Sequence, residues 1–205
     1  MKVLLVNGSP RIDGCTNRAL EEIKVELIKQ EIDAEIVWLG TTVQSCVACG
    51  LCKSSGRCKF NDVVNVFGKK AIDADGFIFG SPVHYASASG LIVSFLDRLF
   101  YCYGNNLEYK PGAAIASARR AGTITTFDQL NKYFTINSMP VVSSQYWNGV
   151  HGTNASDVEK DLEGLQTMRT LAKNMAWLLK SIDAGKTLGI ETPEKEKRER
   201  TNFIR

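Results

Sequence analysis

The sequence lacks the features that would direct a protein to a membrane, a secretory route or a nucleic acid. No apolar run is long enough to span a bilayer, and Met1 leads into the short apolar run 3–6 without the pattern of a signal peptide. The formal net charge of +3 is too small for a nucleic-acid-binding surface. We therefore expect a cytoplasmic protein with no nucleic-acid partner and no membrane contact.

Two nucleotide-binding signatures are missing as well. The glycine-containing loop near the N-terminus does not end in Gly-Lys-Ser or Gly-Lys-Thr, which argues against a Walker A site. Gly8 and Gly14 lack the spacing of GxGxxG, which argues against a Rossmann dinucleotide site. A phosphate site in this loop would therefore take another form.

The length and the apolar pattern fit one α/β domain. The chain has 205 residues, of which 44% are hydrophobic and 23% charged. Short apolar runs alternate with stretches of helical periodicity, as is typical of a parallel sheet covered on both faces. The expected strands are residues 3–6, 34–39, 76–79, 113–117 and 140–143. The first expected helix includes 21–30, the second lies between 62 and 72, and the others are 90–103, 127–134 and 157–182. This pattern predicts a doubly wound five-stranded parallel sheet in a three-layer α/β/α sandwich.

We assign residues 1–184 to this domain, with a cysteine-rich loop at 41–60, and residues 185–205 to a charged C-terminal tail. Phe203 and Ile204 are expected to anchor the tail on the body or on a partner subunit. Ligands of doubly wound sheets bind beyond the carboxyl ends of the strands, where the strand order reverses. The loops after the first, third and fourth expected strands are therefore the candidate binding loops.

The loop after the first strand collects donors for a phosphate group. Residues 7–17, Asn-Gly-Ser-Pro-Arg-Ile-Asp-Gly-Cys-Thr-Asn, lie between a strand and a helix N-terminus, where open N–H groups favour an anion. The candidate ligands are Ser9, Arg11, Thr16 and Asn17. The simpler alternative is a turn in which Thr16 only caps the helix, but a cap needs one hydroxyl and this loop holds several donors.

The other two loops offer groups suited to a flat aromatic ligand. Gly-Ser-Pro-Val-His-Tyr at 80–85 follows the third strand, and Ser-Ala-Arg-Arg-Ala-Gly at 117–122 follows the fourth. The candidate binding residues are Pro82, Val83, His84, Tyr85, Ser117, Arg119 and Gly122. His84 could donate a proton, although packing or hydrogen bonding is the simpler role. Arg119 or Arg120 could stabilise a developing negative charge, or could face solvent.

Together these loops resemble the motifs of the NADPH-dependent FMN reductase family, part of the flavodoxin-like superfamily. The resemblance covers essentially the whole chain. It implies a flavodoxin-like fold in which the first loop holds the FMN phosphate and the loop at 80–85 cradles the flavin ring. It also implies NAD(P)H as the co-substrate and, as is common among related oxidoreductases, a homodimer or higher homo-oligomer.

Four of the six cysteines lie within thirteen residues with the spacing C-x2-C-x2-C-x5-C. They are Cys46, Cys49, Cys52 and Cys58. Such a group in a cytoplasmic protein indicates metal binding or redox chemistry, and it could hold an iron-sulfur cluster, hold zinc or remain metal-free. The spacing resembles that of the iron-sulfur flavoproteins, a branch of the same superfamily, which implies a [4Fe-4S] cluster on these residues. Cys15 and Cys102 stand alone and are expected to be small buried residues.

The combined expectation is an FMN-dependent NAD(P)H oxidoreductase. Electrons would pass from reduced nicotinamide through the flavin to a quinone, a nitro or azo compound, free flavin or a protein acceptor. No catalytic side chain is assigned, because the chemistry belongs to the cofactor. One alternative is an iron-sulfur flavoprotein that carries electrons between protein partners, and another is a redox- or metal-responsive binding protein. The sequence does not choose between NADH and NADPH.

Overall fold

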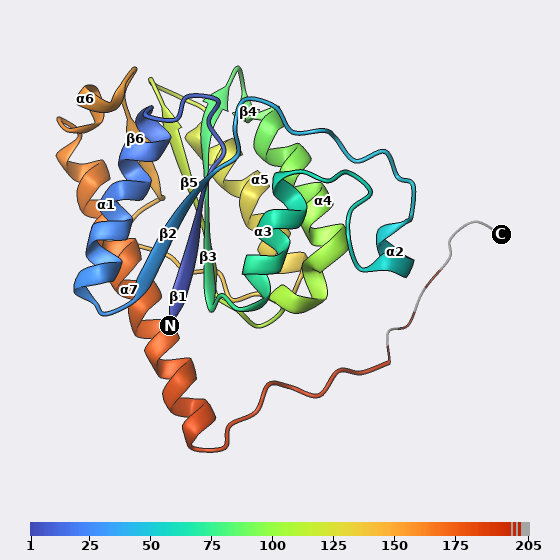
Figure 1. Cartoon of the computed structure of the whole chain (residues 1–205). Helices are drawn as coiled ribbons and strands as arrows, with labels where there is room; N and C mark the ends of the chain where they lie inside the picture. Colours follow the sequence, from blue (N-terminus) through green and yellow to red (C-terminus); the bar gives the residue numbers. More distant parts are fainter. Residues whose placement is uncertain (198, 200, 202–205) are drawn as a thin grey trace.

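The computed structural model describes residues 1–197, 199 and 201, and a parallel sheet forms its centre (Figure 1). The sheet has the order β2-β1-β3-β5-β6. Its strands are β1 (Lys2–Asn7), β2 (Asp33–Trp38), β3 (Gly76–His84), β5 (Gly112–Ala118) and β6 (Gly149–His151), and the short β4 (Ser87–Ala88) pairs antiparallel with the end of β3. The strand order reverses between β1 and β3, which confirms the expected doubly wound, flavodoxin-like fold. With β4 the sheet has six strands, one more than expected.

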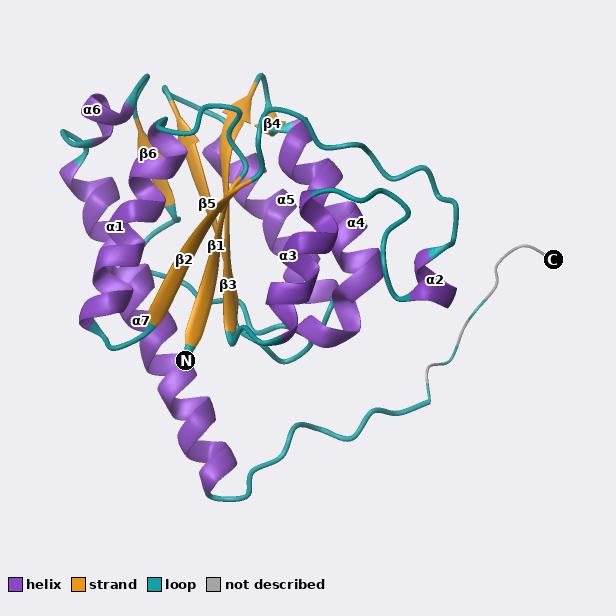
Figure 2. Ribbon diagram, in the orientation of Figure 1, coloured by secondary structure: helices purple, strands orange, loops and turns teal. Residues whose placement is uncertain are grey.

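Helices cover both faces of the sheet and make the expected three layers (Figure 2). On one face lie α1 (Cys15–Lys29), the one-turn α6 (Ala155–Val158) and α7 (Leu162–Thr187). On the other face lie α3 (Val63–Ile72), α4 (Gly90–Leu107) and α5 (Thr123–Ile136). The one-turn α2 (Cys52–Ser55) lies within the cysteine-rich loop. Among the described residues, no helix combines the length and the apolar character needed to cross a membrane.

The residues of β1 alternate between two cores. Val3 and Leu5 pack with α1 and α7, whereas Leu4 and Val6 pack with α3, α4 and α5. All four are fully buried. Burial on both faces explains why this strand is a continuous apolar run rather than an alternating one.

The fifth strand was predicted in the wrong place. Residues 140–143 make only an isolated bridge, between Val141 and Gly112. The chain leaves the sheet after this bridge and pairs with β5 again only at β6. An apolar run that touches the sheet through one bridge cannot be told from a true strand by its composition.

Two further boundaries also differ from the prediction. β3 does not end at Phe79, because Ser81 and Pro82 still pair with β5 and Val83 pairs with β4. The long helix expected over 157–182 is divided into α6 and α7, since the Asp161 carboxylate accepts a hydrogen bond from the N–H of Gly164 and caps a new helix there.

At the C-terminal end, α7 extends to Thr187, past the expected start of the tail at residue 185. The expected anchors Phe203 and Ile204 lie outside the described residues.

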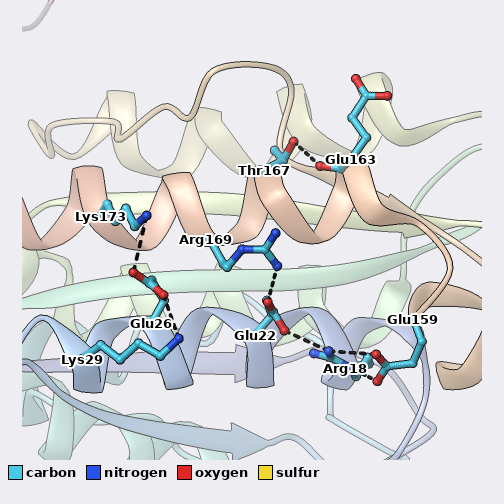
Figure 3. A network of polar contacts seen from close by, with 9 residues as sticks. All are labelled: Arg18, Glu22, Glu26, Lys29, Glu159, Glu163, Thr167, Arg169 and Lys173. Carbon is cyan, nitrogen blue, oxygen red and sulfur yellow. Dashed lines mark hydrogen bonds and ion pairs between the residues drawn. The ribbon is translucent and has the colours of Figure 1, made fainter.

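A polar network fixes α1 against α6 and α7 (Figure 3). Arg18 of α1 pairs with Glu22 at 2.8 Å and with Glu159 at the end of α6. Glu22 also accepts a hydrogen bond from Arg169 of α7 at 2.5 Å. Because α6 directly follows residues 152–154, the network also limits the movement of that loop.

Candidate functional site

The loop between β1 and α1 is held by hydrogen bonds to neighbouring elements. The N–H of Gly8 donates to the Gly80 carbonyl of β3 at 2.9 Å, and the buried Ser89 hydroxyl donates to the Gly8 carbonyl at 2.8 Å. The Trp38 indole N–H donates to the Ser9 carbonyl at 2.8 Å. A Cβ atom at Gly8 would lie 2.8 Å from the Gly80 carbonyl oxygen, so only glycine fits this close approach. The loop is therefore fixed by the protein's own contacts.

The N-terminus of α1 has no capping side chain. Its N-cap is Gly14, and the first turn contains no acidic residue. Side chains cap α3, α4, α6 and α7, whereas α2 and α5 also begin without a capping side chain. The alternative in which Thr16 only caps the helix is wrong, because Thr16 lies inside α1 and its buried hydroxyl hydrogen-bonds that of Ser117 at 2.8 Å. The positive end of α1 is thus suited to an anion supplied from outside.

Most of the predicted cofactor-binding residues gather around one hollow of about 330 Å³. It lies at the carboxyl ends of β1, β3 and β5. The predicted residues that line it are Ser9, Arg11, Thr16, Pro82, Val83, His84, Ser117 and Arg119. The side chains of Arg11, His84 and Arg119 are exposed at its rim. Three loops that are distant in sequence therefore meet where the topology rule placed them.

Three predicted residues do not line this hollow. The Asn17 side chain instead donates to Glu21 at 2.8 Å and accepts from Asn7. Tyr85 has φ +60° and is wholly exposed, so its ring points to solvent rather than forming a wall of the hollow. Gly122 is the N-cap of α5 at φ +90°, where a Cβ would lie 2.7 Å from a Val83 methyl group. Gly122 therefore acts indirectly, since its lack of a side chain leaves room for Val83, which does line the hollow.

The sequence prediction missed one residue that shapes the loop beside the hollow and two that line the hollow itself. Asn7 is fully buried; its side chain accepts from the Ser9 N–H at 3.0 Å and donates to the Ile12 carbonyl at 3.2 Å, which shapes the loop. The sequence does contain a signal for Asn7, because it is a polar residue at the end of an apolar strand. Gly152 and Thr153 form another wall. They follow β6, a strand that was not expected, so no sequence signal placed them here.

The residues present fit FMN. The uncapped α1 N-terminus, the Ser9 hydroxyl and the Arg11 guanidinium supply donors for a phosphate, and the paired hydroxyls of Thr16 and Ser117 border the same space. The segment from Pro82 to His84 borders the same hollow and offers the ring a main-chain surface.

The cysteine-rich loop forms a second hollow of about 410 Å³ against α4. In Figure 1 this loop leaves β2 and passes beyond α3 and α4 to reach α2. The cysteines that line the hollow are Cys46, Cys49, Cys52, Cys58 and Cys102, and other lining residues include Phe60, Arg98 and Tyr101. The two hollows share no lining residue.

The four predicted ligands fit a cluster by their chemistry, since four thiols face one space. Cys46 and Cys49 are exposed, while Cys52 and Cys58 are half-buried. Within the part of the chain that the structure describes, no three cysteine, histidine or carboxylate side chains are close enough together to form a metal site. Holding a cluster therefore requires the exposed pair to move toward the half-buried pair.

The two cysteines expected to be isolated both lie at a hollow. Burial, together with the neighbouring Cys52 and Cys58, raises the pKa of the Cys102 thiol to about 12. Cys15 borders the first hollow, and burial raises the pKa of its thiol also. Both are half-buried rather than fully buried.

Comparisons with known proteins agree with this geometry. Residues 1–154 match the family described as NADPH-dependent FMN reductase. An iron-sulfur flavoprotein of Methanocaldococcus jannaschii is 34% identical over 191 residues, which cover 89% of this chain and 99% of that protein. An iron-sulfur flavoprotein of Methanosarcina thermophila is 27% identical over 188 residues, which cover 89% and 97%. A solved flavodoxin from the domain Archaea has a TM-score of 0.62 at 16% identity and covers 88% of this chain and 99% of its own, which shows the shared fold.

Proposed function

This chain belongs to the NADPH-dependent FMN reductase family of flavin oxidoreductases, and we propose that it binds FMN in the first hollow and oxidises NAD(P)H. The observation that carries the proposal is the uncapped N-terminus of α1, which borders one hollow together with hydroxyl and guanidinium groups of its own loop and of the loop after β5. Bound FMN would supply the hydride and electron chemistry. The protein's part is to bind, orient and tune the cofactor.

The residues around the hollow take distinct parts in this proposal. Ser9, Arg11 and the N–H groups at the start of α1 hold the phosphate. Thr16 and Ser117 fix the two loops to each other through their hydroxyl pair. Arg119, exposed at the rim, places positive charge where a reduced anionic ring would be stabilised. No side chain is assigned to proton transfer.

We further propose that the four cysteines of the second hollow hold a [4Fe-4S] cluster. Support comes from the four thiols that face one space and from relatives whose names describe iron-sulfur flavoproteins. Zinc and metal-free thiols are the competing outcomes. A cluster would transfer single electrons, so a protein acceptor would then be favoured over a quinone, a nitro or azo compound, or free flavin. This is the electron-carrier alternative, and the second hollow favours it.

One experiment distinguishes these functions. The protein is purified without oxygen, its iron and sulfide are measured, and NADH or NADPH is then added in the absence of any helper reductase. We expect about four irons per chain and bleaching of the bound flavin by one of the two nicotinamides. Flavin that stays oxidised with both would overturn the nicotinamide step and leave the electron carrier. Bound flavin without iron would overturn the cluster and leave a simple FMN-dependent reductase.

The proposal also covers the oligomeric state and the cellular location of the protein. We expect a homodimer or higher homo-oligomer, because Tyr85, Tyr146 and Trp147 expose large aromatic surfaces, with Trp147 53% exposed. Light scattering of the purified chain tests this. Thiol ligands require reducing conditions, so we place the protein in the cytoplasm.

A further inference from the structure

Arg98 of α4 is the largest fully buried side chain of the described residues, only 1% exposed. Its two terminal nitrogens bind the Asp62 carboxylate at 2.7 and 2.8 Å. Its remaining donor, Nε, points at the Cys58 sulfur at 3.1 Å. The guanidinium also lies over the Phe60 ring, 5.0 Å from its centroid. Each of the three guanidinium nitrogens therefore has a partner within the protein.

Arg98 forms hydrogen bonds near both ends of the cysteine-rich loop. One terminal nitrogen of Arg98 also donates to the Gln44 carbonyl at 2.9 Å, two residues before the first cysteine of the motif. Cys58 is the last cysteine of the motif. A single buried side chain thus spans the whole segment that would close around a cluster.

The backbone of Cys58 is held by two hydrogen bonds from one buried side chain. The buried Asn65 side chain accepts from the Cys58 N–H and donates to the Cys58 carbonyl, both at 2.9 Å. It is fixed in turn by the Tyr103 hydroxyl at 3.1 Å. Cys46 and Cys49 are exposed. Cys58 is therefore the fixed point toward which the rest of the loop must close.

We propose that Arg98 is a positioning residue of the cysteine site, which holds the Cys58 sulfur through Nε, keeps both loop ends in place and tunes the electron affinity of the cluster bound there. This inference rests on the proposed cluster. An N–H donor to a ligand sulfur withdraws electron density from it and raises the reduction potential of an iron-sulfur centre. The sulfur contact is made by Nε, while the two terminal nitrogens donate to Asp62 and Gln44.

If the role of Arg98 were purely structural, its ion pair with Asp62 would be sufficient. Asp62 also caps α3 by accepting from the Val64 N–H at 3.2 Å, so the pair has a clear folding function. The sulfur contact adds nothing to that function. The two roles are therefore separable by a variant that keeps the charge near Asp62 and removes the Nε donor.

The test compares the wild type, Arg98→Lys and Arg57→Lys after anaerobic reconstitution with iron and sulfide. Arg57 lies in the same loop but is exposed, so Arg57→Lys makes the same chemical change away from the sulfur. We measure the midpoint potential of the cluster by redox titration, the electron paramagnetic resonance signal of its reduced form, and the rate of iron loss to a chelator. For Arg98→Lys we expect a more negative potential, an altered signal and iron loss at least threefold faster, with Arg57→Lys unchanged from the wild type.

A second variant provides the same test in case Arg98→Lys does not fold. Arg98→Met combined with Asp62→Ser removes both members of the ion pair and keeps a hydroxyl to cap α3. It should show the same negative shift in potential. A potential equal to that of the wild type in either folded variant would overturn the role of Arg98. A wild type that takes up no iron would overturn the cluster itself, and that failure would be seen equally in Arg57→Lys.

Discussion

Gly14 offers a direct test of what the α1 N-terminus binds. Its backbone, with φ −80° and ψ −172°, is accessible to any residue, and a Cβ there meets no atom closer than 3.2 Å. In Gly14→Asp the new carboxylate would cap α1 and stabilise the free protein by about 0.5 kcal/mol. The same carboxylate would repel a phosphate, so we expect FMN affinity to fall at least tenfold, as measured by fluorescence titration.

Gly14→Asn is the matched control, because it caps the helix without adding charge. It should gain similar stability and bind FMN more tightly than Gly14→Asp does. Equal affinity in the two variants would mean that no phosphate lies at this helix end.

At the scale of single residues, local polar motifs could be predicted from the sequence and buried contacts could not. Ser9, Thr16 and Ser117 were predicted because hydroxyls next to strand ends are visible in the chain itself. Arg98 was not, since its role depends on Asp62 and Cys58, which only the folded chain brings to it. The positive φ and the full exposure of Tyr85 were also not visible in the sequence.

Among the helices, the contact between α1 and α7 depends on the ionisation of Glu22. Burial by itself raises the pKa of this carboxyl, but hydrogen bonds from Arg169 and Arg18 outweigh it and hold the pKa below the ordinary value of 4.5. A carboxyl with a lowered pKa in the folded state stabilises the protein fully above the ordinary value. That contribution is lost as the pH falls through the lowered folded pKa.

Glu22→Gln should therefore reduce the free energy of unfolding by about 1 kcal/mol near neutral pH. The difference from the wild type should shrink as the pH falls through the lowered folded pKa of Glu22, since the wild-type carboxyl then also becomes neutral. Urea unfolding at neutral pH and at a series of acidic pH values measures this, with the exposed Glu163→Gln as the control expected to change little. A difference that persists unchanged at the acidic pH values would show that the charge of Glu22 does not contribute.

At the scale of elements, the sequence predicted the long strands and helices well and the short ones poorly. β1 and β5 are wholly buried apolar runs or nearly so, and α3 and α4 have clear periodicity. β6 has three residues and α2 four, too few for any period to be recognised. The split between α6 and α7 depends on a cap at Asp161 inside an otherwise continuous pattern.

For the whole molecule, the fold class followed from the alternation of apolar runs and helical periods, and the topology rule then located the site. The loops after β1, β3 and β5 do meet at one hollow. The arrangement of the second hollow could not be predicted. The cysteine-rich loop packs against one side of α4, and only the tertiary fold decides which side. Cys102 and Arg98 entered that site only through the helix packing.

A comparison of FMN with riboflavin shows whether the first hollow binds a flavin through its phosphate. The two ligands share the ring and differ by the phosphate group. Titration of the flavin-free protein, with both ligands measured by calorimetry, should give FMN an affinity roughly 100-fold higher, or about 2.7 kcal/mol. Equal affinities, or no binding of FMN, would contradict the account.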